Sequence, residues 1–115
     1  MIQKLEMTVL IDNLAEAPLV GEWGLSILID VDDRRLLLDT GASGLFAQNV
    51  ERLGLDLGSV DTGVLSHAHY DHADGMETFF AEPQRSVSGA GRRMRKLLRC
   101  EGRYADDSIA CVIQD

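Results

Sequence analysis

The three histidines of this chain lie within six residues, directly after a short apolar segment. The composition of residues 62–66 predicts a buried strand, and the loop that leaves it reads H-x-H-x-D-H. Such a loop can aim alternate side chains at one point, so His67 and His69 are expected to share a metal ion. Asp71 and His72 point elsewhere in this interpretation, and they could hold a second ion. The sequence therefore predicts a metal site at the end of a buried strand.

This residue set favours hydrolysis. Imidazole nitrogens and carboxylate oxygens bind divalent transition metals at about 2.0–2.2 Å, and a zinc-bound water has a pKa near 7. We therefore expect one or two divalent ions, most naturally zinc, acting on an ester, amide, thioester or phosphoester of a small molecule that the sequence does not identify. Asp71, which stands among the histidines, is the candidate catalytic residue. The alternative, solvated histidines with no ligand role, gives no reason for the strand before them.

The remaining segments predict an α/β fold with a mixed sheet and flanking helices. Chain length, 115 residues, allows one domain. Apolar alternation and turn residues predict the following elements: strands over 5–11, 25–31, 35–39 and 62–66, a helix over 45–53, a short helix ended by Pro83, a helix over 92–99 and a last strand over 108–113. In the helix before Pro83, Met76, Phe79 and Phe80 are expected to face inward.

Charge disfavours polyanionic partners. Acidic residues number 19 and basic residues 11, a formal net charge of −8, so neither nucleic acid nor an anionic membrane is an expected partner. Residues 85–115 reverse this balance, and we expect the basic stretch 92–96 to be a solvated helix face, because no aromatic residue interrupts it. No apolar run approaches the roughly 20 residues of a membrane span, and no leader-like segment is evident, which predicts a cytoplasmic protein. Cys100 and Cys111 are expected to be reduced thiols, since their spacing fits no zinc motif.

Three segments carry a resemblance to a known family. They are Gly24–Ile29, Leu36–Gly41 and Leu65–Gly75, and together they resemble the N-terminal half of the metallo-β-lactamase superfamily. The stretch Glu22–Ser26 is most similar to the branch that contains a dihydropterin ribofuranosyl-aminobenzene phosphate synthase. The resemblance covers about residues 3–82. It implies a single domain over 1–115, a truncated half of an αββα sandwich, in which residues 1–84 are family-like and 85–115 form a divergent tail.

The resemblance also implies roles for individual residues. His67 and His69 match ligands of the first metal site, and Asp71 and His72 match ligands of the second. Asp39 matches a buried aspartate that orders the histidine loop, where it would accept hydrogen bonds from a ligating imidazole or from loop amides. The alternative for this residue is an aspartate that caps the turn after it. Gly75 is expected to give backbone freedom where the loop enters the next helix. The implied activity is that of a metal-dependent hydrolase.

The ligand set is incomplete by this comparison. The family's second half supplies further histidines and a bridging aspartate, whereas no histidine follows His72 here. Two ligands per ion are visible, while catalytic zinc normally has three. Three explanations remain open: a truncated, catalytically incompetent chain, self-association, or a separate polypeptide that completes the site. Each predicts an apolar sheet face without a cover within one chain, and a homodimer is the expected assembly.

Overall fold

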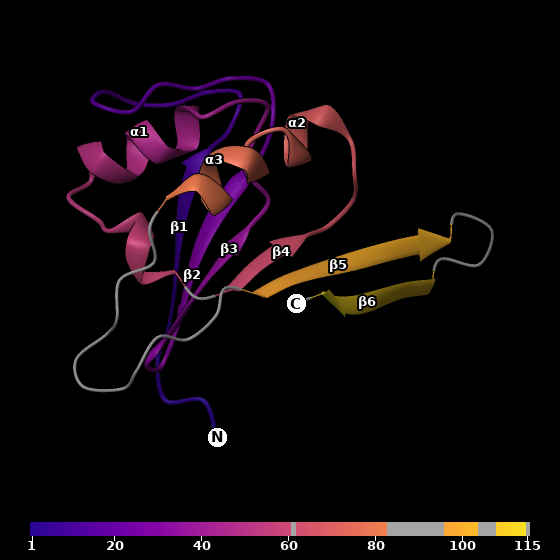
Figure 1. Ribbon diagram of the computed structural model, residues 1–115. Coiled ribbons are helices and arrows are strands. Elements are labelled where there is room, and N and C mark those ends of the chain that lie inside the picture. Colours follow the sequence, from indigo (N-terminus) through magenta and orange to yellow (C-terminus); the bar gives the residue numbers. More distant parts are fainter. Residues whose placement is uncertain (61, 83–95, 104–107, 115) are drawn as a thin grey trace.

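The computed structural model (Figure 1) describes residues 1–60, 62–82, 96–103 and 108–114, with side chains over 1–60 and 62–82. Its elements follow in this order: β1 (Leu5–Ile11), β2 (Ser26–Val31), β3 (Arg34–Leu38), α1 (Leu45–Arg52), the 3₁₀ turn η1 (Leu57–Ser59), β4 (Thr62–Leu65), α2 (Tyr70–Ala73), α3 (Met76–Ala81), β5 (Lys96–Arg103) and β6 (Ser108–Gln114). The strands form one sheet in sequence order. The pairings of β4 with β3 and β5 are parallel and the others antiparallel. The predicted α/β fold with a mixed sheet is confirmed.

One face of the sheet carries the core. Side chains alternate along a strand, so every second residue of β1, β2 and β3 turns toward the helices. Leu28 and Leu37 are register partners, and both are buried against Phe46 and Val50 of α1. Phe79 of α3 closes the same cluster with no exposed surface. Helices α1 and α3 therefore pack on one side of the sheet (Figure 1).

The opposite face of the sheet is also apolar. On β1, Leu5, Met7 and Val9 are 56%, 59% and 48% exposed. The same face continues over β2, β3 and β4, where the register aligns these residues with the side chains Ile27, Ile29, Val31, Leu36, Leu38 and Val64, all of them partly buried. A sheet that is apolar on both faces normally has a layer on each side. Among the described elements, the helices that pack into the hydrophobic core, α1 and α3, cover one side of the sheet only.

Two local predictions are wrong. A helix over 92–99 was expected, but Lys96–Arg99 begins β5 and pairs in parallel with β4, while residues 92–95 lie outside the described part. A short apolar run fits the residue spacing of a helix and that of a strand equally well. The open edge of β4 offers this run backbone hydrogen-bond partners, which favours the strand. Phe80 was expected to face inward and is 48% exposed. The last predicted strand is confirmed as β6, whereas the boundary at residue 84 and the tail's side chains lie outside the described residues.

The sheet topology places the site. Because β3 and β4 are parallel neighbours, their carboxyl ends meet at the same edge of the sheet. Asp39 follows directly after β3, and Ser66 and His67 follow directly after β4. Over the described residues, we find no helix with the length and apolar character that crossing a membrane requires.

Candidate metal centre

Asp39 is held in an unusual backbone conformation. Its φ of 55° lies in the left-handed region, which residues other than glycine rarely adopt. Its amide donates to the carbonyl of Val64 at 2.8 Å, and its own carbonyl accepts from the hydroxyl of Ser26 at 2.7 Å. The residue is only 1% exposed. A strained backbone at a buried acidic residue, over-determined by its neighbours, is typical of a functional site.

The carboxylate of Asp39 accepts three hydrogen bonds. Oδ1 accepts from the backbone amide of Ser66 at 2.8 Å. Oδ2 accepts from the hydroxyl of Ser66 at 2.5 Å, and it lies 2.8 Å from Nδ1 of His72. These partners satisfy a charge that would otherwise be costly to bury. The carboxylate therefore joins the turn after β3 to the loop after β4.

The three imidazoles gather around His67. Its ring centroid lies 4.1 Å from that of His72 and 4.7 Å from that of His69. Oδ2 of Asp71 lies 3.6 Å from Nε2 of His72. His69 is the exposed member, while His67, Asp71 and His72 are partly buried. These contacts link the four predicted ligands in a row from His69 through His67 and His72 to Asp71. Within the described residues, the group whose ligand atoms lie close enough for one ion contains His67 and His72 of the four, together with Asp39.

The backbone of the histidine loop is held by two other segments. The carbonyl of His72 accepts from the amide of Thr40 at 2.8 Å and from its hydroxyl at 3.1 Å. The carbonyl of Asp71 accepts from the amide of Leu25 at 3.3 Å. Gly24 lies so close to this contact that a Cβ would stand 2.4 Å from the Asp71 oxygen, and its φ is +150°. Thr40 and Gly24 therefore shape the loop without carrying any chemistry themselves.

Gly75 is needed for a different reason from the expected one. Its φ of −82° is open to any residue, so backbone freedom does not explain it. A Cβ at this position would lie 2.4 Å from the carbonyl oxygen of Thr40 and 2.6 Å from that of Ser43. Close approach of two chain segments therefore demands the glycine.

The donor set fits a divalent transition metal. Ligand atoms of Asp39, His67 and His72 all lie within 4.8 Å of one another, a spacing that one ion could span. Imidazole with carboxylate suits zinc and its neighbours in the first transition row. Both oxygens of Asp39 already accept hydrogen bonds, however, so its geometry is that of a residue that orients ligands. The nitrogens of His67 and His72 that face away from Ser66 and Asp39 remain for an ion.

Sequence reasoning missed Ser66, Ser26 and Thr40. Ser66 precedes the motif directly and Thr40 follows Asp39 directly, so adjacency to predicted site residues was the only available signal. Ser26 lies thirteen positions before Asp39, and only the pairing of β2 with β3 brings it close. All three act through hydrogen bonds to the loop or to Asp39.

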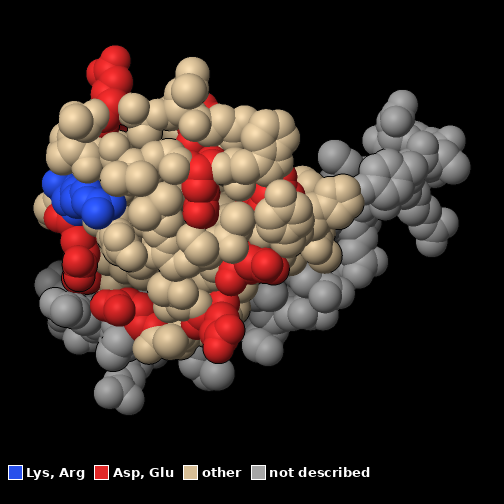
Figure 2. Space-filling model, turned by 90° about the horizontal axis from the view of Figure 1, so that it is seen from above, with Lys and Arg blue, Asp and Glu red and all other residues tan. Residues whose placement is uncertain are grey.

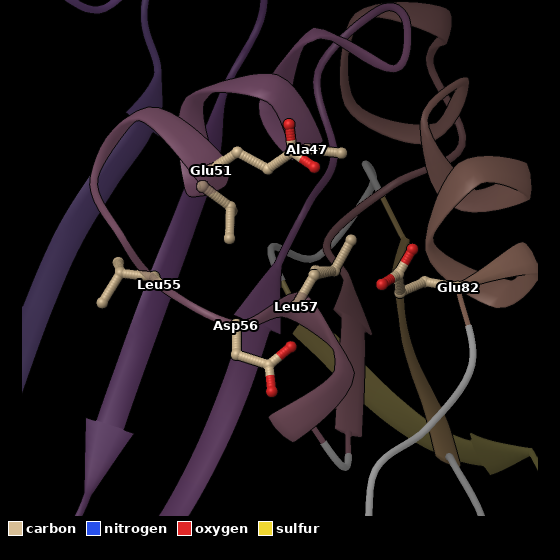
Figure 3. Close-up of a pocket in the computed structure, with 7 residues that line it drawn as sticks. Ala47, Glu51, Leu55, Asp56, Leu57 and Glu82 are labelled. Carbon is tan, nitrogen blue, oxygen red and sulfur yellow. The ribbon is translucent and has the colours of Figure 1, made fainter.

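A separate cavity of about 270 Å³ lies beside α1 (Figure 3). Its lining includes Ala47 and Glu51 of α1, Asp56 and Leu57, and Glu82 after α3. None of the predicted ligands lines it, so this cavity is not part of the metal centre.

The sequence of this chain matches a known protein family and one curated protein. The model of a protein family described as Anti-Pycsar protein Apyc1 matches residues 14–94, which include Asp39 and the whole histidine loop. An uncharacterized protein of Methanocaldococcus jannaschii, MJ0448, is 36% identical over 69 residues, which are 60% of this chain and 27% of that protein.

Solved structures agree with this. The crystal structure of Tm1679, a metal-dependent hydrolase of the β-lactamase superfamily, superposes with a TM-score of 0.54 at 37% identity, covering 64% of this chain and 26% of that one. A putative metallo-β-lactamase of Thermotoga maritima has the same fold, with a TM-score of 0.51 at 18% identity over 67% of this chain and 40% of that one. The sheet and flanking helices are thus similar to the metallo-β-lactamase fold. The chain spans about a quarter of the length of MJ0448 and Tm1679.

Proposed function

Since the chain belongs to the Anti-Pycsar protein Apyc1 family and to the metallo-β-lactamase superfamily, we propose that its histidine loop holds the metal of a hydrolase. The observation that carries this proposal is the gathering of His67, His69 and His72 above one buried carboxylate. The name of Tm1679, a metal-dependent hydrolase that is 37% identical, supports the same reaction class.

His67, His69, Asp71 and His72 would hold one or two divalent ions, with zinc as the proposed metal. When bound, such an ion supplies a nucleophile near neutral pH, because it lowers the pKa of a coordinated water to about 7. Asp39 orients His72 through Nδ1, which leaves Nε2 directed toward Asp71. Asp71 carries its carboxylate at the partly exposed side of the cluster, where it can accept a proton or bind the ion.

The substrate class stays broad. Among the described residues, the face in Figure 2 carries scattered acidic groups and few Lys or Arg side chains, which supports small molecules over polyanions as partners. The finer resemblance to the branch with the dihydropterin ribofuranosyl-aminobenzene phosphate synthase stays a prediction. A hydrolysable ester, amide or phosphoester remains the proposed substrate type.

A second candidate function follows from the open sheet face. We propose as the alternative that the chain forms a homodimer and binds metal weakly or not at all. The half-exposed Leu5, Met7 and Val9 favour it, because an apolar face of this kind normally marks an interface. In this alternative the face is covered by a second copy. A third possibility is a distinct polypeptide that covers the face and adds ligands, and a homodimer observed by light scattering would count against it.

Metal content tests the main proposal. The chain is purified without chelators, and zinc per chain is measured by plasma mass spectrometry. One to two equivalents are expected, with most of the metal lost in the His69→Ala variant. Glu77→Gln is the matched control, since Glu77 is exposed on α3, outside the cluster. A chain without metal at saturating zinc would contradict the proposal and favour the non-catalytic homodimer.

A further inference from the structure

We infer that Ser66 is a positioning residue that determines which ring nitrogen of His67 is free to bind a metal ion. Its hydroxyl oxygen lies 2.5 Å from Oδ2 of Asp39 and 2.9 Å from Nδ1 of His67. The hydroxyl therefore stands between a buried carboxylate and an imidazole. The ligand role of His67 rests on the proposed function, but the hydrogen-bond arrangement concerns the chain without metal.

The first step is the direction of the bond between Ser66 and Asp39. The carboxylate accepts a backbone amide on Oδ1 and lies 2.8 Å from Nδ1 of His72 on Oδ2, as an ionised acid does. Two oxygens 2.5 Å apart need a proton between them, since two acceptors at this distance would repel. An ionised carboxylate has no proton to give, so the hydroxyl of Ser66 donates to Asp39.

The second step is the tautomer of His67. A serine hydroxyl has one proton and two lone pairs, and its proton is already used on Asp39. At 2.9 Å from Nδ1, its oxygen can then only accept. Nδ1 of His67 must carry the ring proton, and Nε2 has the free lone pair. The chain of donors runs from His67 through Ser66 to Asp39.

The carboxylate of Asp39 thus determines which ring nitrogen carries the proton in both His67 and His72. His72 donates from Nδ1 directly to Oδ2 of Asp39, and His67 donates to the same oxygen through the hydroxyl of Ser66. Both rings then present Nε2 as the nitrogen without a proton. Partners of this kind orient metal ligands, and their loss typically lowers metal affinity about 10- to 100-fold.

The chain offers matched variants. Ser66→Ala removes the hydroxyl and keeps the backbone amide that bonds Oδ1 of Asp39. Ser66→Thr restores a hydroxyl at the same place. Ser26→Ala is the control, because it deletes a buried hydroxyl that bonds the main-chain carbonyl of Asp39 and does not touch either imidazole. A merely structural role for Ser66 would make the Ser66→Ala and Ser26→Ala variants behave alike.

Long-range ¹H–¹⁵N correlation spectra of the metal-free, ¹⁵N-labelled chain at pH 8 read the tautomers directly. In the unaltered chain we expect His67 and His72 to carry the proton on Nδ1. In Ser66→Ala, His67 should shift toward the Nε2–H form that imidazole favours in water, while His72 keeps Nδ1–H. Zinc affinity, measured by competition with a chromophoric chelator, should fall about tenfold or more in Ser66→Ala. Ser66→Thr should keep both properties, and Ser26→Ala should leave both tautomers unchanged.

An Nε2–H tautomer of His67 in the unaltered chain would overturn the inference, whatever the zinc affinity is and whether or not Ser66→Ala folds. An unchanged His67 tautomer in a folded Ser66→Ala variant would also overturn it. An Nδ1–H tautomer in a chain that binds no zinc would instead sink the proposed function and leave this inference standing.

Discussion

Replacing Asp39 by asparagine or by alanine removes different parts of its network, and the difference can be worked from the structure. Asparagine keeps one oxygen that can accept from the amide of Ser66, and it tolerates the left-handed φ of 55°. Its amide nitrogen, however, would take the place of Oδ2 and face Nδ1 of His72, which is also a donor. Alanine removes every acceptor, and it adopts the left-handed region at a cost of about 1 kcal/mol.

The magnitudes follow from the bonds lost. A hydrogen bond to a charged group contributes about 1.5–3 kcal/mol, and a buried donor left without a partner costs about 1–3 kcal/mol. In Asp39→Asn the hydroxyl of Ser66 can turn to accept from the new amide, so only the bond to His72 is lost, and we expect a destabilisation of about 2–3 kcal/mol. Asp39→Ala also strands the amide of Ser66 and adds backbone strain, which gives about 4–7 kcal/mol.

Urea unfolding followed by far-ultraviolet circular dichroism measures both free energies of unfolding. Small domains are typically stable by about 5–15 kcal/mol, so the alanine variant should lie near the limit of folding while the asparagine variant remains folded. In the folded Asp39→Asn chain the proton of Ser66 no longer points to residue 39 and can face Nδ1 of His67, so both His67 and His72 should carry their protons on Nε2, and zinc affinity should fall. If both variants lost less than about 1 kcal/mol, or if the two losses were equal, the assignment of three bonds and a strained backbone to Asp39 would be refuted.

Two further predictions concern the loop and the open sheet face. Gly24→Ala should lose about 2–3 kcal/mol in urea unfolding, because a Cβ there meets the carbonyl of Asp71 at 2.4 Å, whereas Gly54→Ala, with nothing within 4 Å, should lose only about 1 kcal/mol from its φ of +70°. Equal losses would argue against the close approach. If the chain is a homodimer through the open face, Met7→Lys should convert it to a monomer by light scattering after size-exclusion chromatography. Glu6→Gln changes the charge by the same amount and should leave the dimer intact.

The sequence predicted the elements that depend on local pattern. Apolar alternation predicted a strand over 5–11 and helical spacing predicted a helix over 45–53, and both are confirmed as β1 and α1. The helix expected over 92–99 failed because a short apolar run fits both periods, and only the neighbouring edge of β4 decides between them. Non-local pairing is the information that a local pattern lacks.

The same limit applies to the candidate site. The histidine motif identified the four predicted ligands, since ligand chemistry is carried by residue type and close spacing. The assignment of His67 and His69 to one ion and of Asp71 and His72 to another stays a prediction, while in the metal-free chain the ring of His72 lies nearer to His67 than that of His69 does. The hydroxyl of Ser66 and the left-handed backbone of Asp39 leave no signature in composition or periodicity. They follow from the meeting of two parallel strand ends, which only the folded sheet provides.

Hydrogen bonds within the described part of the chain already organise the loop. Asp39, Ser66, Thr40 and Leu25 hold the imidazoles and the loop backbone. The geometry of the visible ligands should therefore persist even if the coordination of an ion is completed elsewhere. Zinc binding and hydrolytic activity can then be lost independently of each other. A chain with an incomplete ligand set can bind zinc through pre-oriented nitrogens and still lack activity. Zinc binding without turnover would therefore indicate missing ligands, whereas absence of both with intact tautomers would indicate that the loop is no longer a metal site.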